Sequence, residues 1–266
     1  MRALGILDKM PTSFINPVQY FLTLGADRIA MNELVGREIT LRWTHNIYCT
    51  VCGKKTNKSF GEGMCYPCFA TAPENSECIV RPELCRAHLG QGRDAEWENK
   101  HHNRPHYVYL ALTNAVKVGV TREDQIPTRW IDQGAHKGII LVQAPYRQIA
   151  GLVEVALKEH LSDKTNWQRM LKNESAVELE LLSEKKRVAA LLAEEYHQYL
   201  HTNDEVVEII YPVLEYPAKV ASISLDKIDS ITLPLKGIRG QYLMFEGGNV
   251  INIRKHSGYE VELIVN

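Results

Sequence analysis

The spacing of hydrophobic and polar positions divides the 266-residue chain into two β-rich ends and a mixed central part. Apolar and polar residues alternate through 17–48, which predicts strands with one buried face. The strand pattern returns after 205 in short runs bounded by turns, at 206–213, 241–245, 250–254 and 260–265. Residues 34–41 and 235–243 have similar sequences, which favours one small β unit formed from both chain ends.

The central part combines strand and helix patterns. Residues 106–112 and 115–120 are β-rich and are separated by a short polar turn, which predicts a hairpin. A short helix is expected over 128–133, between Pro127 and Gly134. The remaining elements are predicted from hydrophobic periodicity as a strand over 139–143 and amphipathic helices over 147–161 and 174–200.

Two Cys-x2-Cys pairs, Cys49/Cys52 and Cys65/Cys68, carry the most specific chemical signal in the sequence. Each short turn lets both thiolates of a pair reach one ion, and four thiolates can surround Zn2+ at about 2.3 Å. Gly53 permits a left-handed turn directly after the first pair. Since four protein ligands leave no position for water or substrate, we expect a structural zinc site.

The six cysteines would form disulfides if the chain were secreted. However, residues 1–14 lack the apolar run of a signal peptide, and no stretch approaches the ~20 apolar residues of a membrane span. We therefore expect a cytoplasmic protein without a membrane segment. Its cysteines would stay reduced and available to a metal ion.

A second and looser group of metal-binding side chains follows, consisting of Cys78, Cys85 and His88. These three residues are predicted to bind a second zinc ion. The fourth ligand would come from one of three nearby residues, Asp94, His101 or His102. The alternative is a pair of buried free thiols beside a surface histidine.

The composition is that of an ordinary globular protein, with 45% hydrophobic and 24% charged residues and a net charge of -1. This balance excludes binding of nucleic acid through bulk positive charge. From Lys100 to Arg147, however, seven Lys and Arg residues outnumber three Asp and Glu residues, a surplus of four (7 − 3). The surplus indicates either a local basic face or an ordinary solvated surface.

Four features within 106–161 suit phosphodiester chemistry, namely Tyr109, Lys117-Val118-Gly119, Arg129 and Glu154. Their order on two strands, the next helix and a later helix resembles a GIY-YIG nuclease domain, over about a fifth of the chain. Tyr107-Val108-Tyr109 stands at the first motif and Lys117-Val118-Gly119 at the second. The chain departs from the family at Tyr107, where the motif has glycine, and at Lys117, where it has tyrosine.

The resemblance implies a catalytic site that acts on DNA or RNA. Glu154 would hold Mg2+ or Mn2+, Arg129 would stabilise the charge of the transition state, and Tyr109 would orient water or the scissile group. Lys117 would act as the base in its neutral form, which burial or neighbouring cations favour. As structural residues instead, Tyr109 would belong to the core, Arg129 to a surface ion pair, and Glu154 and Lys117 to solvated faces.

Over nearly its whole length the chain also resembles a bacterial family known only as domain-of-unknown-function family two-seven-nine-seven. The residues that carry this resemblance are Cys65-Tyr66-Pro67-Cys68-Phe69, Pro82-Glu83-Leu84-Cys85, 126–135 and 162–167. The resemblance implies no activity. The family often has a cysteine at the position of Gly92 in this chain.

The expected fold class is α+β, with a zinc ribbon, a GIY-YIG-like α/β domain and a small β unit formed from both chain ends. The segments are predicted as an N-terminal β segment over 1–48, a zinc-binding module over 49–104, the GIY-YIG-like domain with its long helix over 105–203, and a C-terminal β domain over 204–266. The first functional hypothesis is a metal-dependent nuclease.

The second hypothesis is a non-catalytic, zinc-containing protein that binds nucleic acid. It would contact phosphates through basic residues of the central domain, Arg122, Lys137 and Arg147 as well as Lys117 and Arg129. Bases would stack on Tyr107, Tyr109 and Trp130 if these side chains are exposed. A third hypothesis, a protein-interaction scaffold, requires no positive surface.

Overall fold

The computed structural model describes residues 1–161, 166–174 and 180–265, which divide into two compact units. The first unit comprises Met1–Ala70, Leu171–Asn173 and Ile210–Asn266, and the second comprises Thr71–Met170 and Glu174–Ile209. The predicted zinc-binding module over 49–104 is therefore divided between the two units after Ala70.

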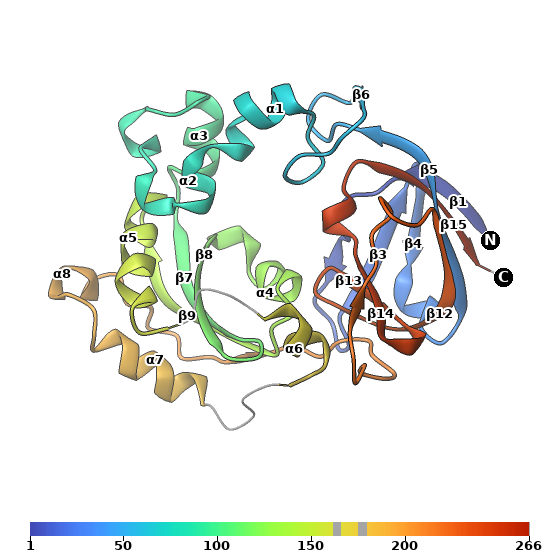
Figure 1. Ribbon diagram of the computed structural model, residues 1–266. Coiled ribbons are helices and arrows are strands. Elements are labelled where there is room, and N and C mark those ends of the chain that lie inside the picture. The colour runs from blue at the N-terminus through green and yellow to red at the C-terminus, as the bar shows by residue number, and fades with distance from the viewer. Residues whose placement is uncertain (162–165, 175–179, 266) are drawn as a thin grey trace. The chain divides into compact units, whose positions relative to one another are not determined.

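The first unit is built on an eight-stranded sheet that combines strands from both chain ends (Figure 1). The strand order is β1-β15-β5-β12-β13-β14-β11, and β6 pairs with β5. The strands are β1 (Arg2–Ile6), β5 (Glu38–Tyr48), β6 (Lys55–Thr56), β11 (Ala221–Ser222), β12 (Ser230–Arg239), β13 (Tyr242–Phe245), β14 (Asn249–Asn252) and β15 (Tyr259–Val265). A separate sheet holds β2 (Thr12–Ser13), β3 (Gln19–Leu24) and β4 (Asp27–Ala30).

The second unit contains a four-stranded sheet in the order β10-β9-β7-β8. These strands are β7 (His106–Leu112), β8 (Val116–Arg122), β9 (Lys137–Ala144) and β10 (Val207–Glu208). The predicted hairpin is confirmed, because β7 pairs antiparallel with β8 from His106/Arg122 to Leu112/Val116. The strand β9 pairs antiparallel with the other edge of β7.

Helices connect and cover these sheets. They are α1 (Tyr66–Thr71), α2 (Glu77–Val80), α3 (Ala95–His101), α4 (Thr128–Asp132), α5 (Arg147–Lys158), α6 (Trp167–Leu171), α7 (Leu181–Ala189) and α8 (Glu194–His197). Short 3-10 helices are η1 (Met31–Leu34), η2 (Pro73–Asn75), η3 (Pro82–Leu84), η4 (Ala87–Leu89), η5 (Glu123–Gln125), η6 (Glu246–Gly248) and η7 (Arg254–His256). Within the described ranges, none of the helices has the length and apolar character needed to cross a membrane.

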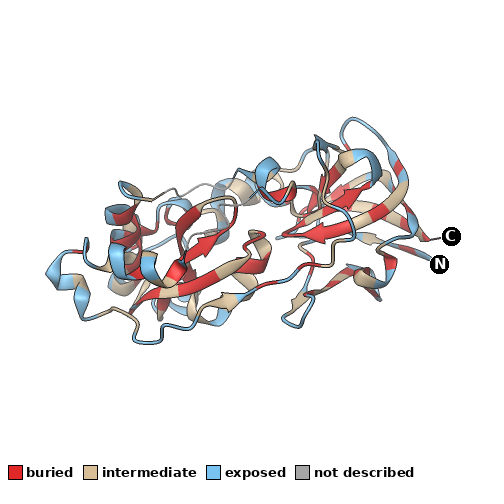
Figure 2. Cartoon of the chain, turned by 90° about the horizontal axis from the view of Figure 1, so that it is seen from below, coloured by how far each residue is buried: buried red, intermediate tan, exposed pale blue. Residues whose placement is uncertain are grey.

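The core of the second unit lies between one face of its sheet and the helices α5 and α7. Alternate residues of β7, Val108, Leu110 and Leu112, belong to this buried cluster, which also includes Val153 of α5 and Val188 of α7. The strands are accordingly buried along most of their length (Figure 2). Because side chains alternate across a strand, Tyr109 points to the opposite face.

The predicted single helix over 174–200 is wrong. Its described residues form α7 and α8, and 175–179 lie outside the described residues. The helical path is interrupted at Ala193, whose backbone is extended with φ −60° and ψ 147°. Glu194 and Glu195 then occupy the first turn of α8, where carboxylates interact favourably with the helix dipole.

The predicted strand over 206–213 is also wrong in its extent. Only Val207–Glu208 form a strand, β10, and it pairs with β9 of the central sheet. The chain passes into the first unit at Ile210. The last strand of the central sheet therefore comes from a segment that sequence analysis assigned to the C-terminal β domain.

A glycine of α5 allows the backbone around η3 to approach that helix closely. A Cβ atom at Gly151 would lie 2.2 Å from the Glu83 backbone nitrogen and 2.4 Å from the Pro82 carbonyl carbon. No real Cβ tolerates such distances, and the atoms it would meet belong to the backbone. The sequence Pro82-Glu83 therefore packs on α5 only because residue 151 has no side chain.

Gly151→Ala should destabilise the second unit. Alanine in a helix normally gains about 1 kcal/mol over glycine, but overpacking costs about 1–3 kcal/mol and here meets rigid backbone. We expect a net loss of unfolding free energy in urea denaturation. The matched control is Val155→Ala on an exposed position of the same helix, which should change stability little; a stabilised Gly151→Ala variant would contradict the close packing.

Candidate functional site

The four cysteines of the two Cys-x2-Cys pairs come together in the first unit. Their sulfur atoms all lie within 4.8 Å of one another, and Cys52 Sγ is 3.8 Å from Cys65 Sγ. The first pair occupies the turn between β5 and β6, where Gly53 adopts the predicted left-handed conformation with φ +70°. The four thiols are thus close enough to bind one zinc ion.

Backbone amides prepare the first of these cysteines for ionisation. Burial opposes ionisation of the Cys49 thiol, but N–H groups at Cys52, Cys65 and Val51 lower its pKa to about 6. The Cys52 N–H donates to Cys49 Sγ over 3.5 Å. A thiolate is the form that binds a metal, so this turn favours the required charge state.

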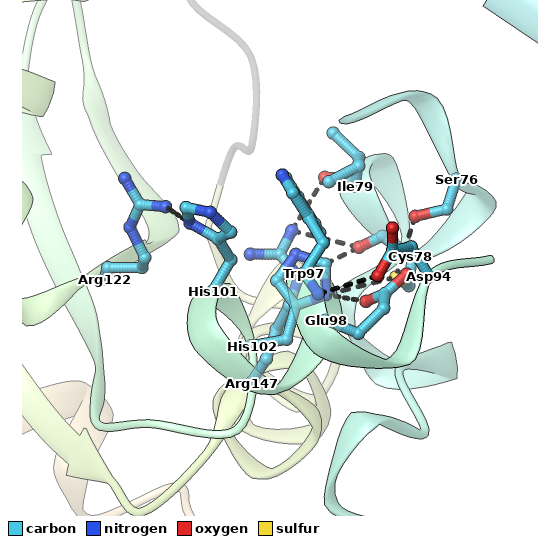
Figure 3. A network of polar contacts seen from close by, with 10 residues as sticks. All are labelled: Ser76, Cys78, Ile79, Asp94, Trp97, Glu98, His101, His102, Arg122 and Arg147. Atoms are coloured by element: carbon cyan, nitrogen blue, oxygen red, sulfur yellow. Dashed lines mark hydrogen bonds and ion pairs between the residues drawn. The ribbon is translucent and has the colours of Figure 1, made fainter. Parts of the chain in front are cut away.

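A second cluster of possible metal ligands lies in the second unit. It consists of Cys78 on α2, Cys85 after η3, Glu98 on α3 and His102 at the C-terminal cap of α3. One ligand atom from each residue lies within 4.8 Å of the other three, and all four residues are buried. Glu98 and His102 form an ion pair across one helical turn (Figure 3).

This cluster does not contain His88, which sequence analysis proposed as a ligand. The His88 ring instead stacks on Tyr146, with 4.4 Å between ring centroids. Of the three proposed fourth ligands, only His102 joins the two cysteines. Asp94 accepts a hydrogen bond from the Trp97 backbone nitrogen over 2.9 Å, and His101 lies 2.6 Å from an Arg122 nitrogen.

The two cysteines of this cluster differ in their readiness to ionise. Hydrogen bonding with Cys85 is the main cause that lowers the pKa of Cys78, to about 4, and the same contact raises the pKa of Cys85. Ser76 Oγ lies 3.3 Å from Cys78 Sγ and adds a further hydrogen bond. The cluster therefore favours negative charge on Cys78.

A cleft of about 260 Å3 lies in the second unit, and all four catalytic candidates line it. These are Tyr109 of β7, Lys117 of β8, Arg129 of α4 and Glu154 of α5, together with Arg147 and Lys158 at the two ends of α5. The walls also include Ile79, Val80 and Pro82 from the α2 and η3 segment. Residues separated by up to 79 positions along the sequence thus share one polar cleft (158 − 79).

The floor of the cleft is set by the contact between Tyr109 and Gly119. These residues are directly opposite each other on β7 and β8. A Cβ atom at Gly119 would lie 2.5 Å from the Tyr109 hydroxyl oxygen, so the ring fits only over a glycine. The fully buried Tyr109 hydroxyl donates a hydrogen bond to Gln133 Oε1 over 3.0 Å. Burial raises the pKa of Tyr109, and hydrogen bonding from Arg129 opposes the rise.

Glu154 and Lys117 are buried, which excludes the solvated positions considered for them from sequence. Their exposed fractions are 8% and 7%. Glu154 Oε2 forms an ion pair with Lys158 Nζ at 3.3 Å, one helical turn away. Burial raises the pKa of the Glu154 carboxyl, although Lys158 and Arg147 oppose this effect. The carboxylate is therefore held in a site where its charge is costly, as is common for functional groups.

These residues belong to a chain whose positions 36–261 match the family described as Protein of unknown function (DUF2797). The chain belongs to this family. No curated protein and no solved structure matched it. The family description assigns no activity, so the chemistry of this DUF2797 member must be inferred from its own residues.

Of the five basic residues proposed for nucleic-acid contact, Lys117, Arg129 and Arg147 line the cleft, and Arg122 and Lys137 do not. Arg147 lines the cleft, and its guanidinium donates to the backbone carbonyls of Cys78 and Ile79 over 2.9–3.1 Å. Outside the cleft, Arg122 forms an ion pair with Asp124 at 3.3 Å, and Lys137 forms one with Glu208 at 2.9 Å.

Base stacking on two of the three predicted aromatic residues is excluded by burial. Tyr109 and Trp130 are 0% and 1% exposed, and Trp130 packs edge-on against Tyr109 and over Gly138. Tyr107 is partly exposed and contacts His201, with 5.7 Å between ring centroids.

Sequence analysis did not include two residues that line the cleft, Gln133 and Lys158. The helical spacing of Glu154 and Lys158 is a signal that could have predicted their contact.

Glu154→Gln should gain stability relative to the wild type as the pH rises. Because the pKa of Glu154 is raised in the folded state, the unfolded state releases its proton first, and wild-type stability falls as the pH rises through the folded pKa. Glutamine has no charge to bury and escapes this loss. Urea denaturation from about pH 4 to about pH 8 measures the difference.

The matched control is Glu159→Gln, at an exposed position just beyond the same helix, which should show no such trend. A Glu154→Gln variant whose stability relative to wild type declines with rising pH would show that its ion pairs outweigh burial.

Proposed function

We propose that this protein is a metal-dependent nuclease that cleaves DNA or RNA in the cleft of its second unit. The observation that best supports the proposal is the charge of that cleft. Four cations, Lys117, Arg129, Arg147 and Lys158, surround one carboxylate, Glu154, which gives a net charge of +3 (4 − 1). Such a site suits a phosphodiester together with one divalent cation.

The size and burial of the cleft support this choice of substrate. A volume of about 260 Å3 has room for a phosphodiester group. Charges at partly buried positions act through a lower effective dielectric constant than charges in water. Cations fixed there can therefore stabilise the negative charge that develops on phosphate oxygens during cleavage.

Some residues of the cleft would bind the phosphate, and others would hold these binding side chains in position. Arg129 hydrogen-bonds to the Tyr109 hydroxyl, and that hydroxyl donates to Gln133, so a chain of polar contacts fixes the direction of both side chains. Arg129 would stabilise the transition-state charge, and the buried Tyr109 would hold Arg129 in position for this role rather than orient the attacking water or the scissile group, the role expected from sequence. Lys117, on the strand opposite, would bind the phosphate and accept a proton when neutral.

Glu154 would hold the Mg2+ or Mn2+ ion. Mg2+ keeps several waters and binds through one or two carboxylates plus substrate phosphate oxygens, so a single carboxylate beside a phosphate site fits it. The ion would neutralise charge on the phosphate. Glu154 Oε2 is paired with Lys158, which leaves Oε1 as the oxygen that can meet a metal ion without breaking this pair.

The resemblance to GIY-YIG nucleases gives separate support. In this chain a hairpin, β7 and β8, is followed by α4, β9 and α5, the order that the resemblance implies. The contact of Gly119 with Tyr109 gives a physical reason for glycine in the second motif. Lys117 remains the departure, because a cation replaces the tyrosine expected there.

The same contacts favour one alternative, binding of nucleic acid without cleavage. Glu154 is already paired with Lys158, and its raised pKa reflects an environment that disfavours its charge. Both features oppose binding of a metal ion. A cleft that keeps Glu154 paired would still bind phosphate through its cations.

Cleavage assays separate these functions. Labelled single- and double-stranded DNA and RNA should be cut in the presence of Mg2+ or Mn2+ and not in EDTA. Glu154→Ala and Arg129→Ala should each lower the rate on the order of 100-fold, since each removes charge stabilisation. The matched control is Lys137→Ala, a cation outside the cleft, which should retain the wild-type rate.

Cleavage that survives Glu154→Ala would rule out this site. Tight binding without cleavage by the wild type would favour the non-catalytic alternative. Melting curves of each variant distinguish loss of activity from loss of folding.

We also propose that Cys49, Cys52, Cys65 and Cys68 bind one structural zinc ion as thiolates. The four sulfurs supply a closed tetrahedral set, and the ion would join the β5–β6 turn to the start of α1. Zinc can contribute on the order of 10 kcal/mol to the folding of a small module, because the site does not exist in the unfolded chain.

Cys65→Ser should release one zinc ion per chain and lower the melting temperature. Metal analysis of the purified protein and thermal unfolding measure these effects. Lys54→Ser, on an exposed position of the same turn, is the control and should retain the ion. A Cys65→Ser variant with unchanged zinc content and melting temperature would refute the structural role.

A further inference from the structure

In the buried cluster of Cys78, Cys85, Glu98 and His102, three ligand atoms lie so close together that one proton cannot link all of them by hydrogen bonds. Cys78 Sγ lies 3.7 Å from His102 Nδ1, and Glu98 Oε2 pairs with the same nitrogen. An imidazole nitrogen carries at most one proton, so it cannot donate fully to both acceptors. A metal ion accepts a lone pair from all three atoms at once.

The distance between Cys78 and His102 suits tetrahedral zinc. With Zn–S of about 2.3 Å and Zn–N of about 2.05 Å, the sulfur and nitrogen of a tetrahedral site are about 3.6 Å apart. The observed 3.7 Å between Cys78 Sγ and His102 Nδ1 matches this edge. Cys85, which is 1% exposed, completes the set of ligand atoms.

Glu98 has the environment of a ligand rather than of a surface carboxylate. It is 2% exposed, and its Oε2 contacts His102 Nδ1 but has no partner in hydrogen-bond geometry among the described residues. Burying a carboxylate costs free energy unless positive charge compensates it. Gly92 adjoins this side chain, and a Cβ atom there would lie 2.4 Å from Glu98 Cγ and 2.9 Å from Oε1. Glu98 therefore occupies space that a side chain at position 92 would otherwise fill.

We propose that Cys78, Cys85, Glu98 and His102 bind a second structural Zn2+ through two thiolates, one carboxylate oxygen and one imidazole nitrogen. Soft thiolates with an imidazole in tetrahedral geometry select zinc among the common divalent ions. The set is closed, because four protein atoms fill the coordination sphere. The ion has a structural role and takes no part in catalysis.

This zinc ion holds the segment that forms one wall of the cleft. The Arg147 guanidinium donates hydrogen bonds to the backbone carbonyl oxygens of Cys78 and Ile79 (Figure 3). The Pro82 and Glu83 backbone packs on Gly151, one turn before Glu154. Loss of the ion would therefore loosen the wall against which Arg147 and Glu154 are positioned. Loosening this wall would also lower the rate of cleavage, and only this effect on cleavage rests on the proposed function.

Counting zinc tests the site without any assay of activity. Metal analysis after removal of loosely bound ions should give two zinc ions per chain for the wild type. Cys65→Ser and His102→Ala should each retain one ion, and the double variant none. The matched controls are His88→Ala and Asp94→Asn, adjacent residues outside the ligand set, which should retain two.

Glu98 decides between this ligand set and a site with three protein ligands. Glu98→Gln keeps the size of the side chain but removes the anionic oxygen, and it should weaken the second zinc by at least about 10-fold in a chelator competition. Glu98→Ala should lose the ion. Adding Gly92→Cys to Glu98→Ala should restore two zinc ions, because the new thiol enters the space that the carboxylate leaves.

One zinc ion in the wild type would overturn the proposal, and so would full retention of two ions in Glu98→Ala. Loss of zinc from His88→Ala would point to the ligand set expected from sequence spacing. A protein that holds two zinc ions but cleaves no nucleic acid would preserve this inference while refuting the nuclease. A nuclease that holds one ion would do the reverse.

Discussion

The organisation of the cleft depends on the guanidinium of Arg147 at the first turn of α5. It donates three hydrogen bonds to the carbonyl oxygens of Cys78 and Ile79 and so joins the cysteine-bearing segment to the helix that carries Glu154. Burial lowers the pKa of Arg147, and negative charge on Cys78 and Cys85 opposes this effect. The Arg147 cation and negative charge on Cys78 therefore stabilise one another, and the hydrogen bonds of Arg147 fix the wall of the cleft.

The strands and helices with strong periodicity were predictable from sequence, and so was a β unit formed from both chain ends, but the individual long-range strand pairs were not. The β7–β8 hairpin, α4, β9 and α5 follow from local alternation and helical spacing. The strand β12, which pairs with β5 across the chain, was not predicted because Pro234 and Gly237 interrupt its apolar run. Gly237 marks a shift of register, and Pro234 lies at the end of the pairing with β5. Only the tertiary partner explains an extended strand there.

In the candidate site, too, some residues could be predicted from sequence spacing and others could not. Tyr109, Lys117, Arg129 and Glu154 were named from motif order, and they line one cleft. The Cys-x2-His spacing suggested His88 as a ligand. In the structure His88 lies in the short 3-10 helix η4, which begins after Arg86 and ends before Gly90, and its ring stacks on Tyr146. Glu98 and His102, four residues apart on α3, were the stronger signal, because this spacing puts two side chains on one helical face.

The burial of Lys117 could not be read from sequence, because β8 lies at the edge of its sheet and an edge lysine is normally solvated. Here the face of β8 that carries Lys117 and Gly119 forms the cleft. Burying Lys117 and Glu154 in one small space costs desolvation energy. Under the proposed function this cost is offset when a phosphate enters, because its negative charge interacts favourably with Lys117 in an environment of lower effective dielectric constant than water.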